Sequence, residues 1–172
     1  MARPIEGTYP VYFETYISQV KENELKEAFK NQQNIVDSFF DAIPEEKTNT
    51  GYAPGKWSLK ELLQHIIDTE RIFNYRSLCF ARKETASLPG FEENDYAANS
   101  NANLRTWKSL CDELKAVRIT TIMLFDSFTD DTLNNAGIAN NEPTTALSIG
   151  FINVGHLAHH KRIIEERYSI DN

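Results

Sequence analysis

The chain has 172 residues, of which 41% are hydrophobic and 25% are charged. This apolar content suffices for one core, so we expect a single domain over residues 1–172. Lys and Arg total 18 against 25 Asp and Glu, and the resulting formal charge of -7 argues against nucleic acid as a partner. The aromatic share of 11% excludes disordered and low-complexity classes, because large side chains supply the burial that offsets chain entropy.

Cysteine usage and the absence of long apolar stretches predict a cytoplasmic protein. Cys79 and Cys111 belong to no C-x-x-C pair and are too few for a disulfide framework, which favours a reducing compartment. The first seven residues contain no apolar signal-peptide core, and no stretch approaches the roughly 18 uncharged apolar residues of a membrane span. We therefore expect no membrane partner.

The first two predicted elements are an aromatic leading segment and a helix. Residues 1–22 include the run Tyr9–Phe13, which is too aromatic for a solvated tail, so we expect this segment to pack across the helices that follow. From Asn23 to Ile43 the apolar residues recur at helical rather than strand spacing. Asn23 is a candidate N-cap, and Pro44 ends the pattern.

A second helix follows the polar connection 45–56 and has a sharper start. Ser58 with Glu61 three residues on is a capping-box pattern, and Trp57 is placed to pack against Leu62. The apolar face of this helix comprises Leu59, Leu62, Ile66, Phe73 and Phe80. The connection after it, residues 83–102, is long for a bundle, so we expect it to cross one end and to carry functional residues.

Two further helices complete the pattern. Residues 103–128 show the three-four alternation of bundle packing, with Arg118 as the discordant member of the inward row. After the Asp- and Asn-rich connection 129–143, the last helix begins at Thr144 or Thr145 and runs to about Tyr168. Four amphipathic helices and no convincing alternating strand predict an all-α fold, an antiparallel four-helix bundle.

All four histidines lie in two of these helices, and this distribution carries the chemical signal. His65 lies in the second helix, and His156, His159 and His160 lie in the last. Residues four apart are separated by about 40° around a helix, so His156 and His160 share a face. That face is the inward one, because isoleucines flank the pair on both sides: Ile149, Ile152, Ile163 and Ile164.

Two imidazoles inside an apolar stripe predict a metal site. Each ring has two nitrogens that need partners, and burial penalises the charged form. Neutral imidazole is a common ligand of divalent ions, with zinc or nickel favoured here, and an i,i+4 pair can present two nitrogens to one ion. His65, at the edge of its helix's apolar face, is placed to supply the third. Three protein ligands leave a coordination position open, as catalytic sites do.

A plainer interpretation stands beside this one. A lone H-x-x-x-H is weak evidence, and an isolated inward histidine is more often a hydrogen-bonded core residue. The third inward histidine and the bundle context favour the metal site. His159 forms an i,i+3 pair with His156, but we expect it to lie beside the site or on the surface.

Three segments resemble the DinB-like family, specifically its YfiT-like branch. The stretch Trp57–Arg71 with Tyr75 and Arg76 looks like the family's second-helix signature, and Leu88–Phe91 matches the branch. The stretch Gly155–His160 resembles the C-terminal G-H-x-x-H-H motif, followed by Glu166–Tyr168. The resemblance implies a four-helix bundle, often a homodimer, with a divalent metal on three histidines.

By motif position the implied ligands are His65, His156 and His160, and all three are present. One departure concerns the residues after the first histidine of the last helix. The family often has Glu there, whereas this chain has Leu157 and Ala158, so any role tied to that acidic residue is absent.

The resemblance implies two enzymatic functions on a small-molecule substrate. DinB-like relatives include transferases that use a low-molecular-weight thiol, in which a metal binds the thiol and lowers its pKa. The YfiT-like branch also includes proteins described as metal-dependent hydrolases. We favour the thiol-dependent S-transferase, followed by the hydrolase, with a noncatalytic metal-stabilised binding or stress protein as a third hypothesis.

Three polar residues are candidates for catalytic roles beside the metal. Arg76 lies three helical turns after His65 on almost the same line, and Arg118 lies in an inward row, so either is placed to bind an anionic part of a thiol or substrate. The alternative, which we favour, is a buried ion pair with Asp68, Glu70 or another carboxylate, or a long side chain that reaches solvent. Asp68, one turn after His65, is a candidate base or orienting residue, although exposed helix carboxylates are common.

Overall fold

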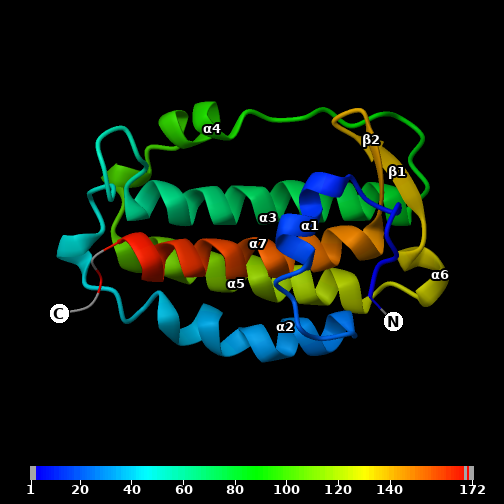
Figure 1. The fold of residues 1–172 in the computed structure, drawn as a ribbon, viewed down its shortest axis with the longest axis horizontal. Helices are drawn as coiled ribbons and strands as arrows, with labels where there is room; N and C mark the ends of the chain where they lie inside the picture. The colour runs from blue at the N-terminus through cyan, green and yellow to red at the C-terminus, as the bar shows by residue number, and fades with distance from the viewer. Residues whose placement is uncertain (1–2, 169, 171–172) are drawn as a thin grey trace.

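The computed structural model describes residues 3–168 and 170 and places the long helices side by side (Figure 1). Its α-helices are α1 Glu14–Ile17, α2 Leu25–Asn34, α3 Leu59–Ala81, α4 Glu93–Asn99, α5 Trp107–Asp126, α6 Asp130–Leu133 and α7 Ala146–Arg167. Its strands are β1 Ala136–Ala139 and β2 Glu142–Thr145, and its 3-10 turns are Val11–Phe13, Glu45–Lys47 and Ala102–Leu104. Within the described residues, none of the helices combines the length and hydropathy that a membrane span requires.

Helices α2, α3, α5 and α7 form the four-helix bundle, which confirms the predicted architecture (Figure 1). The antiparallel expectation holds for α3 against α7 but not for α3 against α5. These two run in the same direction: Arg105 Nη1 donates to Gln64 Oε1 at 2.8 Å near the start of both, and Asn74 Nδ2 donates to Thr121 Oγ1 at 2.7 Å further along. The pair is parallel because the connection returns to the start of α3 before α5 begins.

This connection, predicted to cross one end of the bundle, instead runs back along α3 (Figure 1). Helix α3 is about 34 Å long at 1.5 Å per residue, and residues 82–106 are enough to cover that distance. The connection carries α4 on its way. It therefore covers the side of α3 and not the end of the bundle.

Helix starts follow the predicted capping residues in two cases. Ser58 and Glu61 form the reciprocal capping box of α3, and Thr145 accepts from the backbone N–H of Ser148 at the start of α7. Helix α5 begins later than predicted, because Thr106 caps it and residues 102–104 form a separate 3-10 turn. The first bundle helix also differs, since α2 continues as a π-helical stretch, Ile35–Phe39, that ends before Ile43.

The two-stranded hairpin β1–β2 was not predicted. Its strands pair antiparallel with Ala136 opposite Thr145. The turn residues Asn140 and Asn141 have φ values of 52° and 64°, the left-handed conformation that asparagine tolerates and that tight hairpin turns require. The Asn-Asn pair between two short apolar-containing runs was the available signal for this hairpin.

The segment before α2 packs across α7 (Figure 1). Phe13, Ile17 and Val20 are buried in the same core cluster as α7 residues. Contact at Gly155 is close, because a Cβ atom there would lie 2.2 Å from the backbone oxygen of Tyr16. The missing side chain of Gly155 thus allows α1 to lie directly beside His156.

Candidate metal centre

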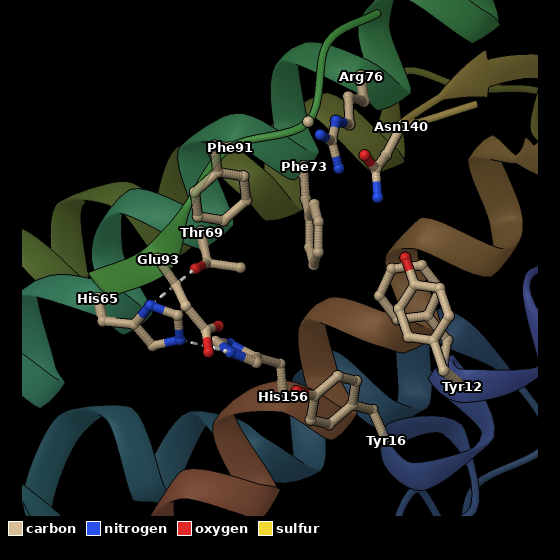
Figure 2. A pocket seen from close by; sticks show the side chains of 12 residues that line it. Tyr12, Tyr16, His65, Thr69, Phe73, Arg76, Phe91, Glu93, Asn140 and His156 are labelled. Carbon is tan, nitrogen blue, oxygen red and sulfur yellow. Dashed lines mark hydrogen bonds between the residues drawn. The ribbon is translucent and has the colours of Figure 1, made fainter. Parts of the chain in front are cut away.

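A pocket of about 240 Å³ opens between the N-terminal segment, α3, the connection after α3 and α7 (Figure 2). Five chain segments contribute to its wall, and most of the contributing side chains are aromatic or polar. The lining residues are Tyr12, Phe13, Tyr16, His65, Thr69, Phe73, Arg76, Gly90, Phe91, Glu93, Asn140 and His156. The pocket is therefore assembled from residues between 12 and 156 of the chain.

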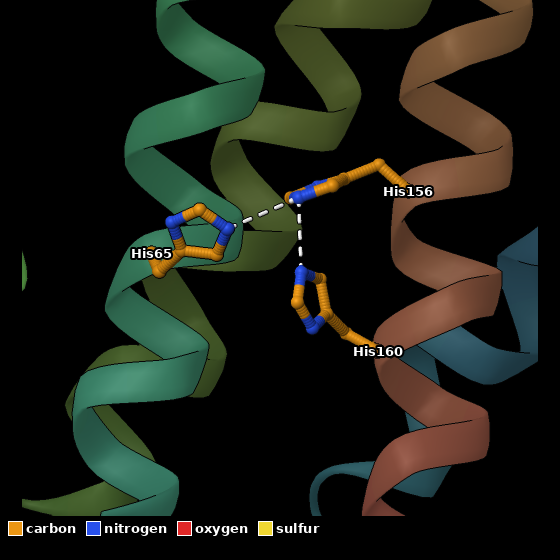
Figure 3. Close-up of side chains that lie close together, drawn as sticks. All are labelled: His65, His156 and His160. Atoms are coloured by element: carbon orange, nitrogen blue, oxygen red, sulfur yellow. Dashed lines mark hydrogen bonds between the residues drawn. The ribbon is translucent and has the colours of Figure 1, made fainter. Parts of the chain in front are cut away.

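At one end of this pocket three histidines converge (Figure 3). Nε2 of His156 lies 3.1 Å from Nε2 of His65 and 3.0 Å from Nε2 of His160. The ligand atoms of all three lie within 4.8 Å of one another, and the residues are only 6%, 5% and 8% exposed. The structure therefore brings together the three histidines that the sequence singled out.

Burial keeps these imidazoles neutral. It lowers the pKa of His65 to about 4, and it lowers the pKa values of His156 and His160 well below 6.5. The neighbouring histidines lower the latter two further, because each disfavours a second positive charge nearby. A neutral imidazole carries one nitrogen lone pair, which is the form that binds a metal ion.

The donor set fits a divalent cation. Without one, Nε2 of His156 would have to serve both neighbouring rings, either by accepting two protons on one lone pair or by sharing one N–H between two lone pairs. A cation instead takes one lone pair from each of the three rings. Two nitrogens each about 2.1 Å from zinc are about 3.4 Å apart at a tetrahedral angle, close to the observed separations. Among the described residues no carboxylate belongs to this group, so a bound cation would have imidazole nitrogens as its protein ligands.

Neighbouring side chains hold the rings in place. Thr69 Oγ1 lies 3.5 Å from Nδ1 of His65, and the indole of Trp57 packs on the same imidazole with ring centroids 4.9 Å apart. Tyr16 meets His156 edge-on at 5.3 Å. Such outer contacts fix the orientation of metal-binding imidazoles.

A comparison with protein families matches residues 28–164 to the model of the DinB superfamily. The chain belongs to the DinB superfamily. The match covers the bundle from α2 to most of α7 and includes all three histidines of the site.

A solved structure also resembles this DinB protein over nearly its whole length. YfiT from Bacillus subtilis, described as a probable metal-dependent hydrolase with an unusual four-helix bundle topology, aligns with a TM-score of 0.69. The alignment covers 95% of this chain and 89% of that chain at 17% sequence identity. At that identity the likeness establishes the shared fold. Among curated proteins, none matches the DinB protein in sequence.

The predicted catalytic residues lie in three different environments. Arg76 lines the pocket, as its position in line with His65 suggested. Arg118 lies outside the pocket lining and is fully buried, where its Nε and Nη2 both donate to Glu70 at 2.9 Å. This is the buried ion pair that the sequence left open as the alternative. Asp68 also lies outside the lining, where it accepts from Gln64 Nε2 at 2.9 Å.

His159 does not belong to the group of three. Its Nδ1 lies 3.2 Å from Gln19 Nε2, and its ring meets Tyr16 edge-on. It therefore lies beside the site in contact with the N-terminal segment.

Several lining residues were not predicted. Glu93 extends from α4 toward the histidine end, and Asn140 extends from the hairpin turn toward the other end (Figure 2). Glu93 carried no distinguishing signal, since it stands in an acidic run with Glu92 and Asp95. The aromatic character of the leading segment was noted, but nothing in it indicated that Tyr12 and Tyr16 face a site.

Proposed function

We propose that this DinB protein is a divalent-metal-dependent hydrolase of a small substrate. The observation that carries the proposal is the convergence of three neutral imidazole nitrogens at one end of an open pocket. Three protein ligands would leave a coordination position for water or substrate, the arrangement found in catalytic metal sites. A divalent ion supplies Lewis-acid chemistry there, because it polarises a carbonyl oxygen and lowers the pKa of water.

Glu93 is the residue we assign to proton transfer. It lines the pocket at the histidine end but is not among the three clustered ligands, so its carboxylate is free to act as a base. In hydrolysis the oxygen of water bonds to the acyl carbon while the bond from that carbon to the leaving group breaks. Glu93 takes the proton that water releases and returns it to the leaving group.

Pocket size supports hydrolysis over thiol transfer. A transferase must accommodate both a thiol cofactor and an electrophile, whereas a hydrolase needs one organic substrate and water. The volume of about 240 Å³ lies below the range of roughly 300–1,000 Å³ typical of drug-sized ligand sites. This favours the hydrolase over the S-transferase, which reverses the order expected from the sequence.

The thiol-dependent S-transferase stays the second candidate because of one observation. Arg76 in the pocket wall is placed to hold the carboxylate of a thiol whose sulfur reaches the histidine end. Saturating thiol should then be required for turnover of an alkylating substrate, while the hydrolase acts on esters or amides with no thiol present.

The experiment combines metal analysis with turnover. We expect purified protein to bind about one zinc or nickel ion and to hydrolyse members of an ester and amide panel, and chelation should abolish that activity. Glu93→Gln should lower kcat about 100-fold or more without changing metal content, because it removes the base and leaves the ligands. Asp95→Asn is the matched control, since it makes the same charge change on α4 outside the pocket lining.

Three outcomes would overturn the proposal. One is full metal loading with no turnover on any ester or amide, which supports the noncatalytic hypothesis. Another is activity that survives chelation. The third is turnover that appears only when a thiol is added.

A further inference from the structure

Arg76 is a buried cation without a carboxylate partner. The residue is 7% exposed, and it forms no ion pair with the described part of the chain. Its Nη2 donates to the backbone oxygen of Pro89 at 2.8 Å, and its guanidinium carbon lies 5.6 and 6.0 Å from the ring centroids of Phe73 and Phe91. Within the described residues one of its five N–H donors makes a hydrogen bond, which leaves the others available to a ligand.

The other deeply buried arginine shows what a satisfied guanidinium looks like in this fold. Arg118 donates to both carboxylate oxygens of Glu70 and to Oε1 of Gln32. Arg76 has no such partners, and desolvation lowers its pKa below the usual value. A guanidinium that is largely removed from water and has no counterion gains free energy when an anion binds to it, so an anionic ligand is expected here.

Two polar side chains lie beside Arg76 at the same end of the pocket. The amide of Asn140 and the guanidinium of Arg76 both point into the cavity, and Tyr12 lies across from them (Figure 2). Burial raises the pKa of the Tyr12 hydroxyl, and the positive charge of Arg76 acts against that rise. An arginine, an amide and a hydroxyl together offer the donors that an oxyanion accepts.

The backbone around this end is built to hold Asn140 in place. The connection pairs with the hairpin, because Leu88 N donates to Ile138 O at 2.8 Å and Asn140 N donates to Leu88 O at 3.0 Å. A Cβ atom at Gly90 would lie 2.4 Å from Oδ1 of Asn140, so only glycine leaves room for that amide. The connection and the hairpin therefore close this end of the pocket together.

We propose that Arg76, Asn140 and Tyr12 bind a carboxylate group of the substrate, at the end of the pocket opposite the histidines. This inference rests on the proposed hydrolase and names its substrate class. His65, Thr69, Phe73 and Arg76 follow one face of α3 over about three turns, so the carboxylate is held away from the bond that is cleaved. Phe73 and Phe91 line the pocket near Arg76, where they contact an apolar part of the substrate.

Charge favours a carboxylate over a phosphate. Arg76 is the only Lys or Arg among the lining residues, and Glu93 adds a negative charge to the same pocket. A dianion would meet a single positive charge and a repelling carboxylate, whereas a monoanion matches Arg76 alone. The substrate class is thus a small, elongated acyl compound with one carboxylate, such as the monoester of a dicarboxylic acid.

The catalytic test compares a monoester of an aliphatic dicarboxylic acid with the diester of the same acid. The metal-loaded wild type should prefer the monoester in kcat/KM, and Arg76→Gln should reduce that preference about 100-fold. Arg76→Lys should restore part of the preference, because it restores the charge without the planar fork. Arg82→Gln is the matched control: it removes the same charge from an arginine on the same stretch of chain, outside the pocket lining, and should keep the preference. Equal loss for both substrates in Arg76→Gln would overturn the assignment.

A binding test separates this inference from the proposed function. Metal-free wild type is titrated by calorimetry with the dicarboxylic acid monoamide and, separately, with inorganic phosphate. We expect the carboxylate to bind, Arg76→Gln to lose at least tenfold in affinity, and Asn140→Ala to lose less. If this holds while no ester is cleaved, the anion subsite stands and the hydrolase fails. Tighter binding of phosphate, or carboxylate binding unchanged in Arg76→Gln with a native melting curve, would overturn the subsite.

Discussion

The buried polar groups on the two sides of α3 differ in whether they have partners. Toward α5, Glu70 is paired with Arg118 and also accepts from Thr121 Oγ1 at 2.6 Å, so every charge has a partner. Toward α7, three histidine nitrogens face one another, and Arg76 has no counterion in the part of the chain that the structure describes. A network in which every charge is paired holds helices together. Buried nitrogen lone pairs and an unpaired guanidinium instead lower the stability of the fold, and a bound ligand can offset that loss. The difference distinguishes the structural side of the helix from the functional one.

The largest expected effect comes from breaking the paired network toward α5. Glu70→Gln should lower the free energy of unfolding by about 3–5 kcal/mol, because it leaves Arg118 buried with no countercharge. Chemical denaturation followed by circular dichroism measures the change. Glu113→Gln is the control, since its partners Arg71 and Arg105 are partly exposed and such pairs contribute at most about 1 kcal/mol. Similar losses in both variants would remove the contrast between a buried and a surface network.

Toward α7, a metal ion should supply the stability that the side chains alone do not. Zinc or nickel at one hundred times its dissociation constant should raise the free energy of unfolding of the wild type by about 2.7 kcal/mol. His156→Ala should lose that gain, because His156 lies between the other two ligands. His159→Ala should keep it, since that ring lies outside the group. Denaturation with and without metal gives the answer, and equal stabilisation of His156→Ala would contradict the assignment.

The packing of α1 against α7, beside His156, can be tested at Gly155. Gly155→Ala should lower the free energy of unfolding by about 1–3 kcal/mol and displace Tyr16 from His156, because the new methyl group meets backbone. Gly150→Ala is the companion variant, since its new methyl group meets the ends of the Leu25 and Phe125 side chains. Side chains yield more readily than backbone, so we expect the smaller loss there. Thermal melts compare the two, and an equal or larger loss in Gly150→Ala would contradict the close contact with α1.

The smallest expected effect is that of replacing Arg76, and replacing Arg118 should change the free energy of unfolding in the opposite direction. Arg76→Met should raise the free energy of unfolding by about 1 kcal/mol, because it removes an unpaired buried charge and keeps apolar contact with Phe73 and Phe91. Arg118→Met should lower it, since Glu70 would then be buried without a countercharge. Denaturant unfolding curves measure both changes: at an unchanged m-value, a higher midpoint means a more stable variant and a lower midpoint a less stable one. Destabilisation by both would mean that Arg76 serves the fold and not a ligand.

Much of the fold was predictable because its signals are local. The capping box at Ser58 needs only residues three apart, and the shared face of His156 and His160 follows from the period of the helix. The later start of α5 and the π-helical end of the first bundle helix were missed. Capping and packing choices of that kind depend on neighbours distant in sequence, such as Asn103, which accepts from the Ser58 hydroxyl at 2.7 Å.

The site was half predictable for the same reason. The three histidines and Arg76 lie on two regular helices, so their faces could be inferred one helix at a time. Asp68, only three residues from His65, was inferred with them, but its side chain bonds to Gln64 and lies outside the pocket lining. Glu93 and Asn140 lie on a connection and a turn whose positions no periodicity specifies.

By itself the sequence determined the approximate positions of the four bundle helices, which of their faces are apolar and which imidazoles share a face, because helical geometry converts spacing into direction. The tertiary structure alone decided that α3 and α5 run parallel and that the leading segment and hairpin complete the pocket. It also decided that Arg118 pairs with Glu70 while Arg76 forms no ion pair with any described residue. These outcomes depend on contacts between residues tens of positions apart, and the free energy of such contacts is set by how whole elements pack.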